Sequence, residues 1–283
     1  GLKTVDSFIA GSNFYTLDVA DFVGETPNIE DVEVFVAANQ KYTGSLKIPG
    51  ISSAFEVTEA DLRQVAGKFL VAIKGAKDIY NHIVAVKNTE HFITEVSVDE
   101  TDLPQTPIDL FLILSMIAAE GIPAQTIAPK FTGRFNKGVD YVGDLVQFEK
   151  EFDQDLYVIK FAIKEFGLPK TLKLSVHSGS DKFSIYPIIK NLIAKHDVGL
   201  HVKTAGTTWL EEVIGLAEAG GDAFTIAKEV YAGAYGRFDE LTGPYATVID
   251  IDKSALPTPE EVKSWNSDKS VSYTHLRAHE TIP

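Results

Sequence analysis

The chain has 283 residues, of which 45% are hydrophobic and 23% charged, and its formal net charge is −14. This is a globular composition, and the length allows one large α/β domain or two smaller ones. The acidic balance argues against nucleic-acid binding, which needs clustered Lys and Arg, and the absence of cysteine excludes disulfides and thiolate metal sites. Because no long apolar run predicts a membrane span, we expect a cytoplasmic protein without membrane partners.

The first predicted strand is NFYTLDV, residues 13–19. Residues 25–57, with scattered Pro and Gly, are predicted to be an irregular excursion in which KYTGSLKI could form one arm of a hairpin. Thr58 and Asp61 then predict a capping-box start to a helix, because apolar residues follow at spacings of three and four.

From residue 91 onward, predicted strands alternate with predicted helices. The strands are expected near residues 92–99, 125–131, 172–177 and 199–203. Such alternation is typical of βα units and a parallel sheet. The sheet could be open and doubly wound, but no GxGxxG follows the first strand, which weakens a dinucleotide-binding fold.

Polar residues cluster where each predicted strand meets the loop that follows it. In a (β/α)8 barrel these positions converge on one mouth, where barrel enzymes place their chemistry. We therefore predict an α/β fold, a partial (β/α)8 TIM-type barrel with about five parallel strands, over residues 1–266. The closing stretch SVSYTHLRAHETIP does not continue the acidic, helical pattern of the residues before it. Residues 270–283 are therefore interpreted as a non-native tail that packs on nothing, and a genuine basic tail is the alternative.

Two histidines lie on predicted strands beside other polar residues. Alternation of side chains puts His201 and Lys203 on one face of their strand and Ser175 and His177 on one face of theirs. If these faces line the barrel, the histidines share a cavity with Glu100, and imidazoles with a carboxylate and no sulfur suit Zn, Mn, Ni or Co. The alternative for an interior histidine is a hydrogen-bonded core residue.

Several groups are predicted to bind an anionic substrate. Lys130, Arg134 and Lys137 follow one strand and could hold a carboxylate or phosphate, or form a solvated loop. The backbone N–H groups at Thr207 open a helix and favour an anion, although a plain N-cap also explains this residue. Small residues after His177 leave room for substrate, so Ser178 and Asp181 are also expected to bind it.

Four blocks, SVHSGSDKFSIYP, LHVKTAGTTWLEE, VSVDET and APKFTGRFNKGVDYVGD, together resemble the bacterial tagaturonate epimerase family. The resemblance covers about residues 1–266. It implies a metal-dependent epimerase that interconverts D-tagaturonate and D-fructuronate in hexuronate catabolism, while related enzymes act on neutral ketohexoses. Family members are longer at both ends and carry an acidic/His pair ahead of the region resembling GLKT, so we expect a truncated chain that lacks this pair.

The resemblance also implies roles for individual residues. Metal ligands are expected at His177, at His201 and at either Asp140 or Asp144. Glu100 is expected to act as an acid/base group or ligand. Independently of the resemblance, Lys203, which alternation places on the same face as His201, is expected to be catalytic and to meet the anionic substrate.

The inverted carbon is not adjacent to the ketone, so removal of an α-proton cannot invert it. Retro-aldol cleavage with re-addition, or proton transfers that first move the carbonyl, remain as routes. The rival functions are a metal-dependent class II aldolase or ketose isomerase, and a non-enzymatic sugar-acid-binding protein.

Overall fold

The computed structural model describes residues 2–19, 22–99, 101, 103–204, 207–246, 249 and 251–279, without the side chains of 207–210 and 274–279. The chain divides into two compact units, whose boundary passes through strands β6 (Lys173–Gly179) and β7 (Leu200–Thr204). The first unit comprises Gly1–Thr132, Val146–Val176 and Ile189–His201, and the second comprises Gly133–Leu145, His177–Ile188 and Val202–Pro283.

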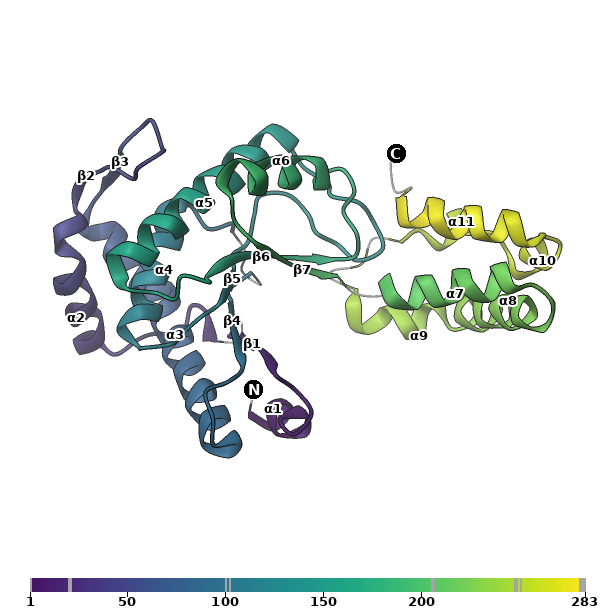
Figure 1. Ribbon diagram of the computed structural model, residues 1–283, viewed down its shortest axis with the longest axis horizontal. Helices are drawn as coiled ribbons and strands as arrows, with labels where there is room; N and C mark the ends of the chain where they lie inside the picture. The colour runs from purple at the N-terminus through teal and green to yellow at the C-terminus, as the bar shows by residue number, and fades with distance from the viewer. Residues whose placement is uncertain are drawn as a thin grey trace. The chain divides into compact units, whose positions relative to one another are not determined.

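A five-stranded sheet runs through the first unit (Figure 1). Its strands are β1 (Phe14–Asp18), β4 (Ile93–Ser97) and β5 (Thr126–Ala128), followed by β6 and β7, in the order β1-β4-β5-β6-β7. The pairs β1–β4, β4–β5 and β5–β6 are parallel. The spatial order follows the chain without the reversal that defines a doubly wound sheet. The predicted α/β fold with five parallel strands is therefore confirmed, whereas closure into a (β/α)8 barrel stays a prediction.

Helices precede and follow the strands of this sheet along the chain. They are α1 (Leu2–Phe8), α3 (Glu59–Lys87), α4 (Pro107–Ala119), α5 (Leu145–Phe166) and α6 (Tyr186–His196). The predicted capping box of Thr58 and Asp61 starts α3, and a second capping box starts α4. Residues 110–117 of α4 are all buried, which explains why this helix is apolar on every side. No helix in the described part of the chain is both long and apolar enough to cross a membrane.

Residues 25–57 are more regular than predicted. They contain helix α2 (Ile29–Asn39), the 3-10 turn η2 (Gln40–Tyr42), and the antiparallel strands β2 (Gly44–Leu46) and β3 (Phe55–Val57). The hairpin arm expected here is confirmed, but the irregularity expected for residues 29–39 is wrong. The Asn28 side chain accepts a hydrogen bond from the backbone N–H of Glu30, and α2 packs against α3. A local cap and a non-local apolar contact together select the helix.

The second unit is mostly helical beyond β7. Its elements are α7 (Thr207–Ala219), α8 (Gly221–Gly236), α9 (Phe238–Thr242), η3 (Gly243–Tyr245), η4 (Lys253–Ala255), α10 (Pro259–Lys263) and α11 (Ser267–His279). Helix α11 packs against α7, and the ring of Tyr273 lies 4.9 Å from that of Trp265. The expectation that the stretch after Ser270 packs on nothing is therefore wrong as far as Tyr273. The side chains of His275 and His279 lie outside the described residues.

Two carboxylates on α5 have pKa values shifted in opposite directions. Asp155 is 4% exposed, and burial, reinforced by the charge of Glu151, raises the pKa of its carboxyl well above the ordinary value. Burial also acts on Asp153, but hydrogen bonds from Lys195 and His196 outweigh it and hold the pKa of this carboxyl below its ordinary value. The helix therefore carries one carboxyl that favours the protonated form and one that favours the ionised form.

We expect Asp155→Asn to stabilise the protein increasingly as pH rises from about 4 towards 8. Folding raises the pKa of this acid, so its contribution to stability is fully present below the pKa of the unfolded chain. The contribution is lost as pH rises through the pKa of the folded protein, and the free energy of unfolding falls by up to about 1.4 kcal/mol per pH unit. Thermal unfolding of both proteins across this pH range measures the difference. Asp153→Asn is the control of opposite sign, because it should destabilise the protein at neutral pH and have less effect in acid. An Asp155→Asn effect that does not change with pH would contradict the assignment.

Candidate active site

Glu95 is a charged residue in the middle of the apolar strand β4, and it is completely buried. In the sheet register its neighbours are Thr16 on β1 and Thr126 on β5. The Thr16 hydroxyl donates to Glu95 Oε1 at 2.9 Å, and the Thr126 hydroxyl donates to Oε2 at 2.8 Å. One layer of side chains across three strands therefore holds this carboxylate, which meets the hydrogen-bonding requirement of a buried charge.

The Glu95 carboxylate in turn holds the imidazole of His201 on β7. His201 Nδ1 lies 2.9 Å from Glu95 Oε2 and 2.9 Å from Ser175 Oγ. The ring of Phe14 lies against the imidazole, with 4.8 Å between the ring centroids. The His201 side chain is 29% exposed, and no hydrogen bond to its Nε2 is formed by the described residues. An imidazole that is held at one nitrogen, and whose other nitrogen has no such bond, can exchange a proton or bind a metal ion.

A second polar cluster lies entirely in the second unit. Lys182 is completely buried, and its ammonium donates to the carbonyl and to the hydroxyl of Ser180, at 2.9 and 2.8 Å. Burial lowers the pKa of Lys182 to about 8, against the charges of Asp140 and Asp181, which raise it. Asp140 is also buried and accepts hydrogen bonds from the backbone N–H and the hydroxyl of Ser184. This cluster ties the loop around residue 140 to the loop after β6.

The structure separates the two aspartates between which the sequence could not choose. Asp140 is 8% exposed and bound to Ser184, whereas Asp144 is exposed. Asp181, a predicted substrate-binding residue, accepts a hydrogen bond from the Tyr186 hydroxyl at 2.7 Å. Asp140 and Asp181 therefore each have a partner within the second unit.

The other predicted residues fall in several environments. His177 on β6 is partly exposed, and Ser178 is buried, with its hydroxyl donating to the Lys203 carbonyl at 3.2 Å. Lys203 and Arg134 are exposed. His177 and His201 belong to different units, so the cavity predicted to join them stays a prediction. Glu100 and the side chain of Thr207 lie outside the described residues.

Lys130 has partners in the loop between β4 and α4. Its ammonium donates to the Thr101 carbonyl, and its backbone N–H donates to Gln105 Oε1 at 2.5 Å. The Gln105 side-chain amide donates to the Thr101 hydroxyl at 2.8 Å, and its backbone N–H donates to the Lys130 carbonyl at 3.1 Å. These bonds fix the loop against the end of β5, so Lys130 has a structural partner in addition to its predicted role in substrate binding.

We expect Gln105→Ala to loosen this loop and to lower the free energy of unfolding by about 1–3 kcal/mol, because the Lys130 N–H loses its partner in a part-buried position. Hydrogen exchange should accelerate at the amides of Thr101 and Lys130. Lys130→Met is the control: it removes the ammonium but keeps both backbone bonds to Gln105, so the Lys130 amide should stay protected. Unchanged exchange at both amides in Gln105→Ala would contradict this role.

A metal site is not completed by the side chains described in the structure. Within the described ranges, no group of three or more His, Asp and Glu side chains lies together in a way that could hold an ion. His201 offers one nitrogen donor supported by a carboxylate, which is the usual environment of a metal-ligating histidine. The Glu95–His201 pair therefore offers one ligand, which is not a complete coordination sphere.

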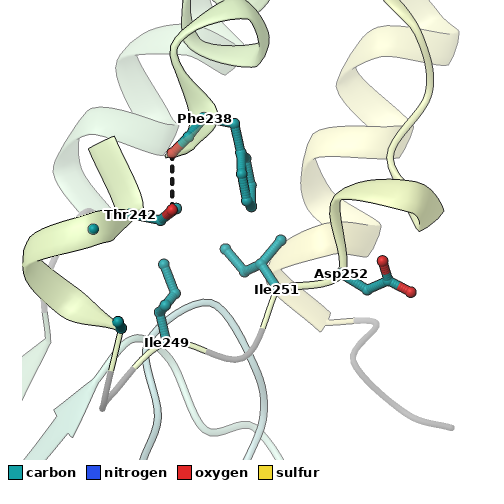
Figure 2. A pocket seen from close by; sticks show the side chains of 7 residues that line it. Phe238, Thr242, Ile249, Ile251 and Asp252 are labelled. Atoms are coloured by element: carbon teal, nitrogen blue, oxygen red, sulfur yellow. Dashed lines mark hydrogen bonds between the residues drawn. The ribbon is translucent and has the colours of Figure 1, made fainter. Parts of the chain in front are cut away.

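The second unit also contains a pocket, lined by α9, η3 and the segment that follows them (Figure 2). Its volume is about 330 Å³, and Phe238, Ile249 and Ile251 supply the apolar wall. The two polar side chains are already engaged, because the Thr242 hydroxyl donates to the Phe238 carbonyl and Asp252 caps η4. Since a sugar acid needs several polar partners, the described lining of this pocket does not favour one.

The fold and the Glu95–His201 pair define a parallel-sheet α/β protein in which a buried carboxylate of the sheet holds a partly exposed imidazole. A family model described as UxaE, tagaturonate epimerase, matches residues 5–274. The tagaturonate/fructuronate epimerase of Thermotoga maritima is 31% identical in an alignment of 266 residues that covers 89% of this chain and 51% of that protein. The chain therefore belongs to the tagaturonate epimerase family, and it spans about half the length of the relatives it matches.

Solved structures agree with this assignment. The crystal structure of the fructuronate-tagaturonate epimerase UxaE from Cohnella laeviribosi with one glycerol has a TM-score of 0.71 at 26% identity, over 96% of this chain and 54% of that one. The native crystal structure of the same enzyme has a TM-score of 0.73 at 24% identity, over 97% and 55%. At that identity the native structure supports the fold alone.

Sequence reasoning missed Glu95 and the partners of Lys182. A signal for Glu95 was present, because a carboxylate between the apolar residues of FITEVSV needs a buried partner. The burial of Lys182 left no such signal, since a lysine in a polar loop reads as solvated.

Proposed function

We propose that this chain supplies part of the active site of an epimerase that interconverts D-tagaturonate and D-fructuronate in hexuronate catabolism. Membership of the family and the similarity to the Thermotoga maritima enzyme support the substrate and the reaction. The observation that carries the proposal is the His201 imidazole, which is held at Nδ1 by the buried Glu95 carboxylate and belongs to a side chain that is 29% exposed. Such a group can take and return a proton next to a bound sugar acid.

A retro-aldol route requires a group that takes up one proton and later returns it. The hydroxyl on the inverted carbon loses its proton, the bond to the carbon beside the ketone breaks, and an aldehyde and an enediolate result. The aldehyde rotates, the carbon–carbon bond forms again on the other face, and the proton returns to the new hydroxyl. In the alternative route a base and an acid first move the carbonyl by proton transfer. Both routes need a base that keeps its proton for return, and we assign this role to His201 Nε2.

A divalent cation, Zn, Mn, Ni or Co, is proposed as the cofactor on the strength of the family resemblance. His177, His201 and either Asp140 or Asp144 are the residues to test as ligands. The lone pair of His201 Nε2 serves either a proton or a cation, so if His201 binds the cation the role of base passes to Glu100. The described side chains do not form a complete site, so no step of the reaction is assigned to a metal here. Elemental analysis of the purified protein, with and without the His201→Ala change, tests the cofactor separately from the activity.

The substrate carboxylate is proposed to meet exposed cations. Lys203 and Arg134 are both exposed, and Lys203 stands two residues after His201 on the same strand, so alternation gives the two the same face. Ser178, Asp181, Lys130 and Thr207 remain proposals for the rest of the substrate, and Glu100 for a second acid/base group.

The proposal is tested by incubating D-tagaturonate with this chain and with a protein of full family length that carries it. We expect D-fructuronate to form with the full-length protein, as detected by carbon NMR. Net formation of free three-carbon products would favour the aldolase alternative. Saturable binding without conversion in the full-length protein would favour a sugar-acid-binding protein instead.

A further inference from the structure

We propose that Glu95 is a positioning residue: it fixes His201 in the tautomer with the proton on Nδ1, so that Nε2 is the nitrogen that meets a proton or a cation. The inference rests on the function proposed above only for what Nε2 does. The tautomer itself follows from the hydrogen bonds around the ring.

The first step concerns the proton on Nδ1. The hydrogen bonds that Thr16 and Thr126 donate to the two oxygens of Glu95 favour its ionised form. An ionised carboxylate has only acceptors, and Glu95 Oε2 lies 2.9 Å from His201 Nδ1. A lone pair on Nδ1 would face that oxygen without a hydrogen between them, which is repulsive in a buried site. Ser175 Oγ, at 2.9 Å from the same nitrogen, can accept as well as donate, so it is compatible with either tautomer. The carboxylate therefore decides the tautomer, and Ser175 adapts.

The second step concerns the fixed position of the carboxylate. Glu95 is completely buried, and the hydroxyls of Thr16 and Thr126 each donate to one of its oxygens. Both threonines are its register partners on the neighbouring strands, so sheet pairing sets their positions. Rotation of the carboxylate away from the imidazole would break these bonds. The sheet therefore holds Oε2 where Nδ1 must donate to it.

The third step concerns the ring. With Nδ1 bound to Glu95 and the Phe14 ring against it, the imidazole has little freedom to turn over. A flipped ring would place a carbon beside the carboxylate and lose the bond. The nitrogen left without a bond from the described residues is Nε2, on a side chain that is still 29% exposed. Either a proton or a divalent cation could approach it there.

The experiment is histidine-tautomer NMR on the 283-residue chain labelled with 15N-histidine. The chain has seven histidines, and a His201→Gln sample assigns the signals of His201. We expect neutral His201 to populate the Nδ1–H tautomer at least about tenfold over the other, which corresponds to about 1.4 kcal/mol. A dominant Nε2–H tautomer in the unchanged protein would overturn the inference by itself, whether or not any variant folds.

Three variants make the test specific. In Glu95→Gln the carboxamide N–H can donate to Nδ1, so we expect the Nε2–H tautomer to gain at least tenfold. Ser175→Ala should leave the Nδ1–H tautomer dominant, because Glu95 remains in place. Asp155→Asn changes another buried carboxyl of the first unit and should leave His201 unaltered. A tautomer switch in Ser175→Ala would assign the positioning to Ser175. An unchanged tautomer in both Ser175→Ala and a folded Glu95→Gln protein would assign it to neither residue.

The measurement needs no substrate and no turnover, so its failure differs from failure of the proposed function. A protein of full family length without epimerase activity would remove the function and leave the tautomer assignment standing. An Nε2–H tautomer would remove the assignment and leave the epimerase proposal to be tested on its own.

Discussion

His201→Asn in a protein of full family length is expected to lower kcat/KM for epimerisation at least about 100-fold, the usual contribution of a positioned acid/base group. Asparagine can place an amide N–H where Nδ1 stands, so the bond to Glu95 can be kept while Nε2 is removed. The midpoint of thermal unfolding should therefore change little. His201→Ala should lose the activity and also some stability, because it removes one partner of a buried carboxylate.

The exposed His91, just before β4, supplies the control for these measurements. His91→Ala should retain full activity and stability. Turnover within about tenfold of the unchanged enzyme in both His201 variants would contradict a role for Nε2 in the chemistry.

His177→Ala is expected to abolish metal-dependent epimerisation while leaving the fold intact. His177 is partly exposed near the end of β6, so its removal should open no large cavity. Activity, bound metal and thermal unfolding of the full-length variant are the three measurements. Near-normal turnover with the metal still bound would refute its assignment as a ligand.

Gly50→Ala is expected to destabilise the first unit by about 3 kcal/mol or more, the sum of backbone strain and overpacking. Gly50 has a φ of 98°, and a Cβ atom there would lie 2.0 Å from the ring of Tyr157 on α5. The Tyr157 ring in turn packs against that of His196, at 4.4 Å between centroids, so it cannot move away without loss. The free energy of unfolding in urea measures the effect.

Gly44 offers a matched control for this change. Its φ is 89°, but a Cβ atom there would meet no other atom within 4 Å. Gly44→Ala should therefore show the backbone strain alone, about 1–2 kcal/mol. Adding Tyr157→Leu to Gly50→Ala should recover part of the loss, and the double-mutant cycle gives the energy of the clash. Equal effects of the two glycine changes would contradict the contact.

Much of the fold was predictable because its causes are local. The five strands appear as short apolar segments between turns, and the capping box of Thr58 and Asp61 needs only residues three positions apart. Where the prediction was wrong, the deciding contact was non-local. Helix α2 is selected partly by packing on α3, and α11 by packing on α7.

The sequence by itself determined the α/β class and the positions of the strands. It also indicated His201 as a candidate site residue and showed a resemblance to the family that the comparisons confirm. Only the tertiary structure decided which nitrogen of His201 is held and what holds it. Thr16 lies 79 residues before Glu95, and His201 lies 106 residues after it. The structure likewise buried Asp140 and exposed Asp144, although both stand in one short loop. The physical reason is that periodicity and capping act within a few residues, whereas the partners of a buried charge are set by sheet register and packing between distant segments.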